Sequence, residues 1–117
     1  ITKSIEIIYG LRNFIGNANK FSSKNIFINL KSNNEITEVI IEDDGNGFPR
    51  DILSKIGEPY LKSNNPIEKS KIGLGLGLFI GKTLLEKNFA SINCRNSETR
   101  TGAEIIIKWN NSDLLKI

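Results

Sequence analysis

The chain has 117 residues, enough for one domain with its own core, and 38% of them are hydrophobic and 25% charged. This composition excludes a disordered chain and a coiled coil, and no apolar run approaches the roughly 18 to 20 residues of a membrane-spanning helix. The chain contains no histidine, which excludes a Ser-His-Asp triad, a Cys-His dyad and an imidazole-bound metal. Its single cysteine, Cys94, excludes an internal disulfide or a cysteine zinc cluster and is typical of a reduced, cytoplasmic setting.

The net charge of +3 is too small to indicate a nucleic-acid partner. Its distribution is uneven, because residues 32–58 carry seven acidic and two basic side chains between two flanks with a basic excess. This pattern fits a site with a metal or base on one side and phosphates on the other, or three solvated faces. The chain opens at Ile1 and contains no methionine, so we expect it to be a piece of a longer protein.

The first half of the chain predicts a helix followed by a hairpin. Apolar residues at helical spacing predict a helix over residues 4–21. Residues 25–31 and 36–43 are predicted strands, joined by a turn rich in serine and asparagine. Turn-forming residues dominate 43–49, and a short helix is expected over residues 50–56, after Pro49.

The second half begins with a polar stretch, residues 58–72, which has two prolines and little periodicity. Loops of this length in small domains are usually functional lids or disordered. A glycine run follows, then a predicted helix that ends near Lys87, and residues 90–95 and 103–109 are predicted closing strands. Because the strands come as neighbouring hairpins between helices, we expect an α+β fold, a two-layer sandwich with helices on one face of a mostly antiparallel sheet. No repeat or linker divides residues 1–117.

The glycine run, Gly73-Leu74-Gly75-Leu76-Gly77-Leu78, is expected to precede the last long helix. Glycines let a backbone approach a ligand, and free amides at a helix N-terminus bind anions, so the run indicates phosphate binding. The alternative is tight packing of a loop under a helix. Two better-known phosphate motifs are excluded: a P-loop needs glycine where Leu76 stands, and a dinucleotide fingerprint needs glycine where Ile80 stands.

Two further polar groups are candidates for a site. Asn13, Asn17 and Lys20 lie at i, i+4 and i+7 on one face of the first predicted helix, followed by Phe21. A carboxamide oxygen suits Mg²⁺, which keeps several of its waters, and a lysine can neutralise phosphate. Taken alone, however, the row is better explained as a solvated polar face, because asparagine is abundant throughout this chain.

The second candidate is the acidic turn Asp43-Asp44-Gly45-Asn46-Gly47, which follows a strand with a buried pattern. A carboxylate at a strand end can accept a hydrogen bond from a ligand amino group, and the glycines beside it leave room for a flat ring. The turn lacks the spacing of an EF-hand calcium loop. Taken alone, the segment fits an ordinary Asp-Gly turn better than a ligand site.

These features occur in an order that resembles the catalytic ATP-binding domain of sensor histidine kinases, in the superfamily shared with gyrase, heat-shock-90 chaperones and MutL. Residues 11–21 resemble the family's N box and residues 43–49 its first glycine box. Glu58-Pro59-Tyr60 resembles the end of the F box, residues 73–78 the second glycine box, and Thr101-Gly102-Ala103 the last one. The segments 57–60 and 75–86 are also similar to the redox-responding RegB/PrrB/ActS kinases.

The resemblance implies the Bergerat-type ATP-binding fold and a role for each box. Asn17 would bind Mg²⁺, with Asn13 and Lys20 in the phosphate region, and Asp43 would accept from the adenine amino group. Residues 58–72 would form the ATP lid, with three lysines, Lys62, Lys69 and Lys71, as candidate phosphate contacts. The remaining positions expected to contact ATP are Phe21, Gly45, Gly47, Phe48, Tyr60, Gly73, Leu74, Gly75, Leu76, Gly77, Leu78 and Gly102.

The resemblance also implies a protein-histidine kinase whose acceptor lies elsewhere, because this chain has no histidine. We expect the partners to be a histidine-bearing dimerisation segment of the same kinase and a response regulator, with no nucleic acid. The fragment is expected to be a monomer and cytoplasmic, and its parent a homodimer anchored in the bacterial inner membrane.

Three other functions stay open. One is an ATPase of the gyrase or chaperone type, although those enzymes have a glutamate general base where Asn13 stands. Another is a serine kinase of the anti-sigma type. The third is a nucleotide-binding interaction module without kinase activity, since Gly57 stands where the wider family has phenylalanine.

Overall fold

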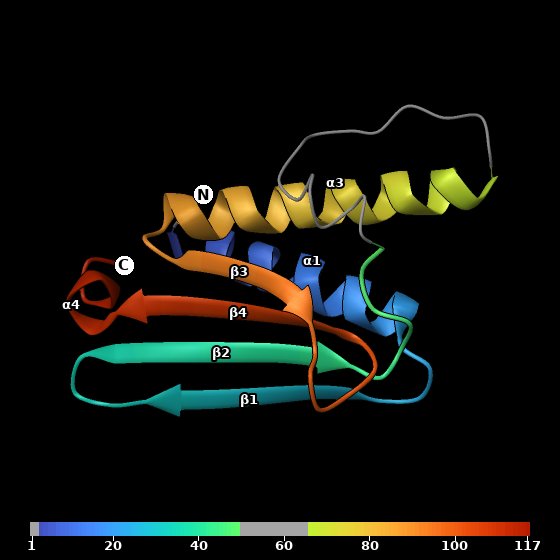
Figure 1. Cartoon of the computed structure of the whole chain (residues 1–117). Helices are drawn as coiled ribbons and strands as arrows, with labels where there is room; N and C mark the ends of the chain where they lie inside the picture. Colours follow the sequence, from blue (N-terminus) through green and yellow to red (C-terminus); the bar gives the residue numbers. More distant parts are fainter. Residues whose placement is uncertain (1–2, 50–65) are drawn as a thin grey trace.

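Four antiparallel strands form one sheet in the order β1-β2-β4-β3, and two long helices cover one of its faces (Figure 1). The structure is a computed structural model that describes residues 3–49 and 66–117. The strands are β1 (Ile26–Ser32), β2 (Ile36–Asp43), β3 (Ser91–Asn96) and β4 (Ala103–Asn110). The helices are α1 (Lys3–Phe21), α3 (Pro66–Lys87) and the short α4 (Asn111–Leu114). The expected α+β fold with helices on one face of an antiparallel sheet is confirmed.

The core lies between the sheet and the helices, because every second residue of β2 and β4 faces α1 and α3. Ile41 pairs with Ile105 across these two strands, and both are buried. From the helices, Phe14, Leu78 and Leu85 are fully buried in the same cluster. The alternation of buried and exposed residues along the strands therefore fixes which face carries the site.

Helices α1 and α3 approach closely because glycines lie at their contact. A Cβ atom on Gly81 would lie 2.7 Å from the Phe14 ring, and one on Gly10 would lie 2.8 Å from Cγ of Leu85. An ion pair of 2.7 Å between Lys87 and Glu6 joins the two helices away from these glycines. The helical layer is thus held at a fixed spacing.

Most predicted boundaries are confirmed to within one residue, but the start of α3 differs from the prediction. The helix begins at Pro66, so residues 66–72 are helical although they were predicted as part of a loop, and the glycine run 73–78 lies inside the helix. Proline is well tolerated at the first helical position, where its missing N–H has no partner to lose. The predicted helix 50–56 and the segment 57–60 lie outside the described residues.

The sequence analysis also missed α4, a helix of 4 residues that continues directly from β4. Among the helices of residues 3–49 and 66–117, none is both long and apolar enough to cross a membrane.

Candidate functional site

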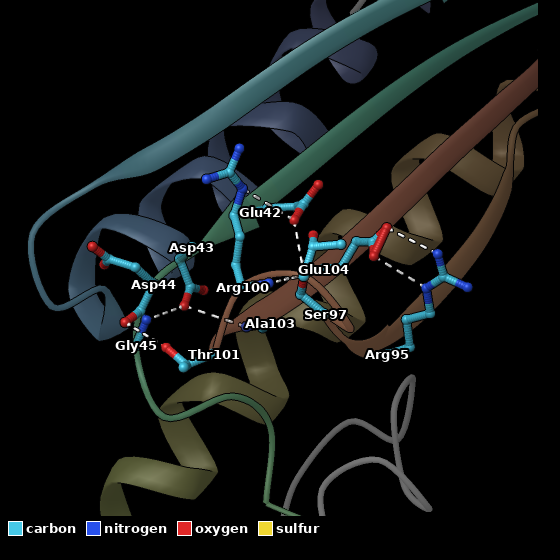
Figure 2. Close-up of polar contacts among 11 residues, drawn as sticks. Glu42, Asp43, Asp44, Gly45, Arg95, Ser97, Arg100, Thr101, Ala103 and Glu104 are labelled. Carbon is cyan, nitrogen blue, oxygen red and sulfur yellow. Dashed lines mark hydrogen bonds and ion pairs between the residues drawn. The ribbon is translucent and has the colours of Figure 1, made fainter.

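The site is built around Asp43, the last residue of β2, which is only 4% exposed. Its Oδ1 accepts hydrogen bonds from the backbone N–H of Gly45 at 2.8 Å and of Ala103 at 3.3 Å (Figure 2). Within residues 3–49 and 66–117, no group donates to Oδ2. Asp43 is therefore a buried carboxylate with one oxygen held by the backbone and the other available to a ligand donor.

Glycines next to this carboxylate allow three chain segments to meet. A Cβ atom on Gly45 would overlap the carbonyl oxygen of Phe21, and one on Gly102 would overlap Oδ1 and the carbonyl oxygen of Asp43. The end of α1, the turn after β2 and the start of β4 therefore come together at the same end of the sheet (Figure 1). Phe21, Gly45 and Gly102, three of the predicted contacts, lie beside Asp43.

The neighbouring Asp44 anchors this junction. Its carboxylate accepts from the backbone N–H groups of Ser23 and Lys24 at 2.9 Å each and of Asn25 at 3.0 Å. The hydrogen bonds from Lys24 and Asn25 hold the pKa of the Asp44 carboxyl below its ordinary value. Thr101 Oγ1 also donates to the Asp44 carbonyl at 3.1 Å (Figure 2). Asp44 therefore ties β2 to the segment after α1, a role that the sequence analysis did not assign.

Asn17, the predicted magnesium ligand, lies between α1 and α3. A Cβ atom on Gly77 would lie 2.8 Å from Asn17 Oδ1, so this glycine lets the carboxamide pack against the α3 backbone. Asn17 Nδ2 is buried and has no hydrogen-bond partner. An unpaired amide donor fits a position that faces a ligand acceptor such as a phosphate oxygen. The neutral Oδ1 of the same amide is the atom that would suit Mg²⁺, which keeps its waters. The described residues contain no group of three or more His, Cys, Asp or Glu side chains that could hold a metal.

Of the other predicted residues of α1, Asn13 is half-buried at the junction with α3, and Lys20 is exposed near the end of the helix. Asn13 donates from Nδ2 to the Tyr9 carbonyl at 2.8 Å and lines a cavity of about 470 Å³. The cavity is also lined by Tyr9, Arg12, Ile80 and Leu84. Lys20 Nζ lies 5.4 Å from the centre of the Phe21 ring, at the end of α1 that meets the turn after β2.

The glycine run differs from its predicted geometry. Because Gly77 lies in the interior of α3, its described contact is packing against Asn17, and Leu78 is fully buried in the core. Gly73, Leu74, Gly75 and Leu76 are helical residues whose side chains lie outside the description, as does Tyr60 entirely. The described part of the run thus matches the packing alternative more closely than a loop at the start of a helix.

Sequence reasoning missed one further contact, between Asn96 at the end of β3 and the turn after β2. Asn96 Oδ1 accepts from the N–H of Phe48 at 2.6 Å, and Asn96 Nδ2 donates to the Phe48 carbonyl at 3.2 Å. Gly47, with φ +79°, precedes this contact. No local pattern distinguishes Asn96 from the many other asparagines of the chain.

The lone cysteine is excluded from the chemistry. Burial raises the pKa of the Cys94 thiol to about 12, which keeps it protonated at neutral pH. Cys94 is a packing residue on the inner face of β3.

A two-layer sandwich with a buried carboxylate at a strand end, glycines around it and an asparagine on the facing helix defines an ATP-binding sandwich domain. The family model described as histidine kinase-, DNA gyrase B- and HSP90-like ATPase matches residues 2–112. The chain belongs to this family.

Named relatives agree with this placement. The chain is 36% identical over 102 residues to the sensor histidine kinase RegB of Cereibacter sphaeroides, covering 83% of this chain and 22% of that protein. It is 32% identical over 100 residues to the sensor protein SrrB of Staphylococcus aureus, covering 84% and 17%. The chain therefore spans about a fifth of the length of these curated relatives.

Solved structures share the fold. The catalytic domain of histidine kinase ThkA matches with a TM-score of 0.70 at 24% identity, covering 91% of this chain and 66% of that one. The mycobacterial sensor histidine kinase MprB matches with a TM-score of 0.67 at 23% identity, covering 87% and 70%.

Proposed function

We propose that this chain is the catalytic ATP-binding domain of a sensor histidine kinase, which transfers the γ-phosphoryl group of ATP to a histidine on a separate dimerisation segment. The observation that carries the proposal is the state of Asp43, a buried carboxylate with Oδ1 held by two backbone N–H groups. Its Oδ2 is the acceptor for the adenine amino group. Similarity to RegB and SrrB, both named as sensor proteins, supports the kinase assignment.

The residues around Asp43 would hold the base and the phosphates. Gly45 and Gly102 let the backbone close tightly around Asp43, and Gly47 lets Asn96 pack on the turn, so these glycines would shape the base site rather than line an open space. Phe21 would lie beside the base, whereas Phe48 is buried in the core and would support the turn from behind. Asn17 would hold Mg²⁺, which neutralises phosphate charge when bound, with Asn13 and Lys20 on the same helix facing the phosphate groups. Residues 58–72, Tyr60 included, would form the lid, of which 66–72 are helical in this structure. Gly73, Gly75 and Gly77, with the leucines between them, would border the phosphates.

The choice between kinase and ATPase depends on Asn13. Activation of a water molecule requires a general base, and a carboxamide cannot accept that proton. We therefore expect slow hydrolysis and favour transfer to a protein acceptor. Because the chain contains no histidine, the acceptor lies on another segment. A histidine-bearing dimerisation segment, a response regulator and a membrane-anchored homodimeric parent complete the proposed phosphorelay, with this domain on the cytoplasmic side.

The adenine contact is tested by calorimetry of Mg²⁺-ATP binding to the chain and to Asp43→Asn. Two backbone N–H groups hold the acceptor oxygen at the Oδ1 position, so the new amide would turn its NH₂ toward the ligand. This places a donor against the adenine amino group, and we expect ATP affinity to fall by at least about tenfold. Inosine triphosphate has a carbonyl acceptor in place of the amino group, so its affinity should fall much less on the Asp43→Asn substitution. Asp113→Asn, on the remote helix α4, is the matched control.

No binding of ATP at millimolar concentration by the unsubstituted chain would contradict the proposal and favour an interaction module. Transfer is tested separately, with radiolabelled ATP and the purified dimerisation segment of RegB. The expected product is phosphohistidine, which is labile to acid and stable to base. Release of free phosphate without labelling of the segment would favour the ATPase alternative.

A further inference from the structure

Asn96 and Ala103 are cross-strand partners that hold opposite ends of the turn after β2. They face each other in the β3–β4 pair. The backbone N–H of Ala103 donates to Asp43, where the turn begins, and the side chain of Asn96 bonds Phe48, where it ends. One cross-strand pair, Asn96 and Ala103, thus holds both ends of the segment 43–48.

Both polar atoms of the Asn96 carboxamide bind the same residue, Phe48. Its oxygen accepts the Phe48 N–H at 2.6 Å, and its nitrogen donates to the Phe48 carbonyl at 3.2 Å, across 48 positions of sequence. Phe48 is 6% exposed and belongs to the core cluster. The two hydrogen bonds therefore connect strand β3 to a residue of the turn that is itself anchored in the core.

The same carboxamide lies over Gly47. A Cβ atom on Gly47 would lie 2.6 Å from Asn96 Oδ1, and the φ of this glycine is +79°. Residues with a Cβ atom rarely adopt this backbone conformation. The turn therefore requires glycine at position 47 for two reasons, the positive φ and the Asn96 side chain packed directly against it. Asn96 thereby selects one path for the chain between Gly45 and Phe48.

We propose that Asn96 is a positioning residue for adenine recognition, which holds the segment 43–48 in the conformation that admits the nucleotide beside Asp43. The inference rests on the proposed function, in which Asp43 Oδ2 accepts from adenine. If the segment 43–48 were mobile in the free protein, ATP binding would have to order it, and the lost conformational entropy would lower the affinity for ATP. A segment that is already ordered avoids this cost. Asn96 is solvent-exposed, so its removal takes away little buried surface and acts mainly through the two hydrogen bonds.

The test combines Asn96→Ala with two readouts, the dissociation constant of Mg²⁺-ATP and the hydrogen-exchange rate of the Phe48 amide. We expect the amide to exchange at least about tenfold faster and ATP affinity to fall by about tenfold, because two hydrogen bonds are lost. The matched control is Arg95→Ala, in the same strand but on the opposite face. Arg95 forms a two-bond ion pair with Glu104 (Figure 2), and within the described residues its side chain has no hydrogen bond to the turn. The control should change stability without changing Phe48 exchange.

A second variant, Asn96→Asp, keeps the acceptor for the Phe48 N–H but replaces the donor with a charged oxygen that faces the Phe48 carbonyl. It should lose ATP affinity at least as strongly as Asn96→Ala, and it serves in place of Asn96→Ala if that variant does not fold. Unchanged ATP affinity in both variants, with the unsubstituted chain binding normally, would overturn the inference. Absence of binding by the unsubstituted chain would contradict the proposed function, while the Phe48 exchange rates would still show whether Asn96 orders the turn.

Discussion

Gly102 lies directly against Asp43, so close that a Cβ atom on the glycine would overlap both the carbonyl oxygen and Oδ1 of the aspartate. This approach is what allows the next N–H, that of Ala103, to reach Oδ1 (Figure 2). The hairpin between β3 and β4 is therefore part of the candidate nucleotide site, although it lies 60 residues along the chain from Asp43.

Gly102→Ala should damage both the fold and the site. Overpacking of this kind typically lowers the free energy of unfolding by about 1 to 3 kcal/mol, and displacement of Asp43 should weaken ATP binding by more than about tenfold. Thermal denaturation and calorimetry measure the two effects.

Gly16→Ala is the control, because a Cβ there meets nothing within 4 Å and Gly16 lies inside α1. It should stabilise the chain by about 0.5 to 1 kcal/mol and leave ATP affinity unchanged. Equal ATP affinities in the two variants would contradict this account of Gly102.

Asn17→Ala should separate folding from magnesium binding. Its Nδ2 is buried without a partner, so removing the amide relieves a desolvation penalty and should leave the melting temperature unchanged or higher. The difference in ATP affinity between Mg²⁺ and EDTA should shrink strongly. Asn19→Ala, two residues on and exposed, should keep the full difference. A magnesium dependence that survives in Asn17→Ala would remove this residue from the metal site.

Asp44 should make stability depend on pH in the acidic range. Hydrogen bonds from Lys24 and Asn25 lower the pKa of its carboxyl in the folded chain, so its stabilising effect is present above the ordinary aspartate value of about 3.9 and is lost as the pH falls through the lowered pKa. Lys87 lowers the pKa of Glu6 in the same direction. Urea denaturation at a series of pH values should show a decline below about pH 4 that is shallower in Asp44→Asn. Glu98→Gln, in an exposed loop, should retain the original decline.

Arg100 connects the β3–β4 hairpin to the open face of the sheet. Its guanidinium carbon lies 3.4 Å from the centre of the Phe27 ring, and its Nε lies 3.5 Å from a Glu42 oxygen that Ser97 also contacts. Arg100→Ala should lower the free energy of unfolding by about 0.5 to 1 kcal/mol. Most of this loss should persist in about 1 M salt, because ring stacking is short-ranged and screening weakens only the charge pair.

The control for Arg100 is Lys108→Ala, which removes an ion pair with Glu38 at 3.7 Å on the same face of the sheet. No ring contact is described for Lys108, so its smaller effect should disappear in high salt. If salt abolished the Arg100 effect as well, stacking on Phe27 would not contribute.

Local patterns were sufficient for most of the fold. The strand bounds, the ends of both long helices and the turn after Asp43 follow from apolar periodicity and turn chemistry, which act between neighbours in sequence. The start of α3 did not follow. Prolines and polar residues resemble a loop, and the glycines Gly77 and Gly81 weaken a helix in isolation. Gly77 and Gly81 are favoured in the helix by packing against Asn17 and Phe14 of α1. These contacts join residues far apart in the sequence, so a pattern of neighbouring residues does not reveal them.

The sequence by itself determined the fold class, because residue type and spacing carry that information. It pointed to Asp43, Asn17 and the surrounding glycines as the candidate site only through the order of their motifs, which resembles a known family, since each motif alone has an ordinary structural explanation. Only the tertiary structure decided how Asp43 is held, with Oδ1 bound to Gly45 and Ala103 and Oδ2 left for a ligand. It also brought Asn96 to Phe48 across 48 residues. These hydrogen bonds depend on strand order and register, which arise when the whole sheet packs against the helices and so cannot be read from any single segment.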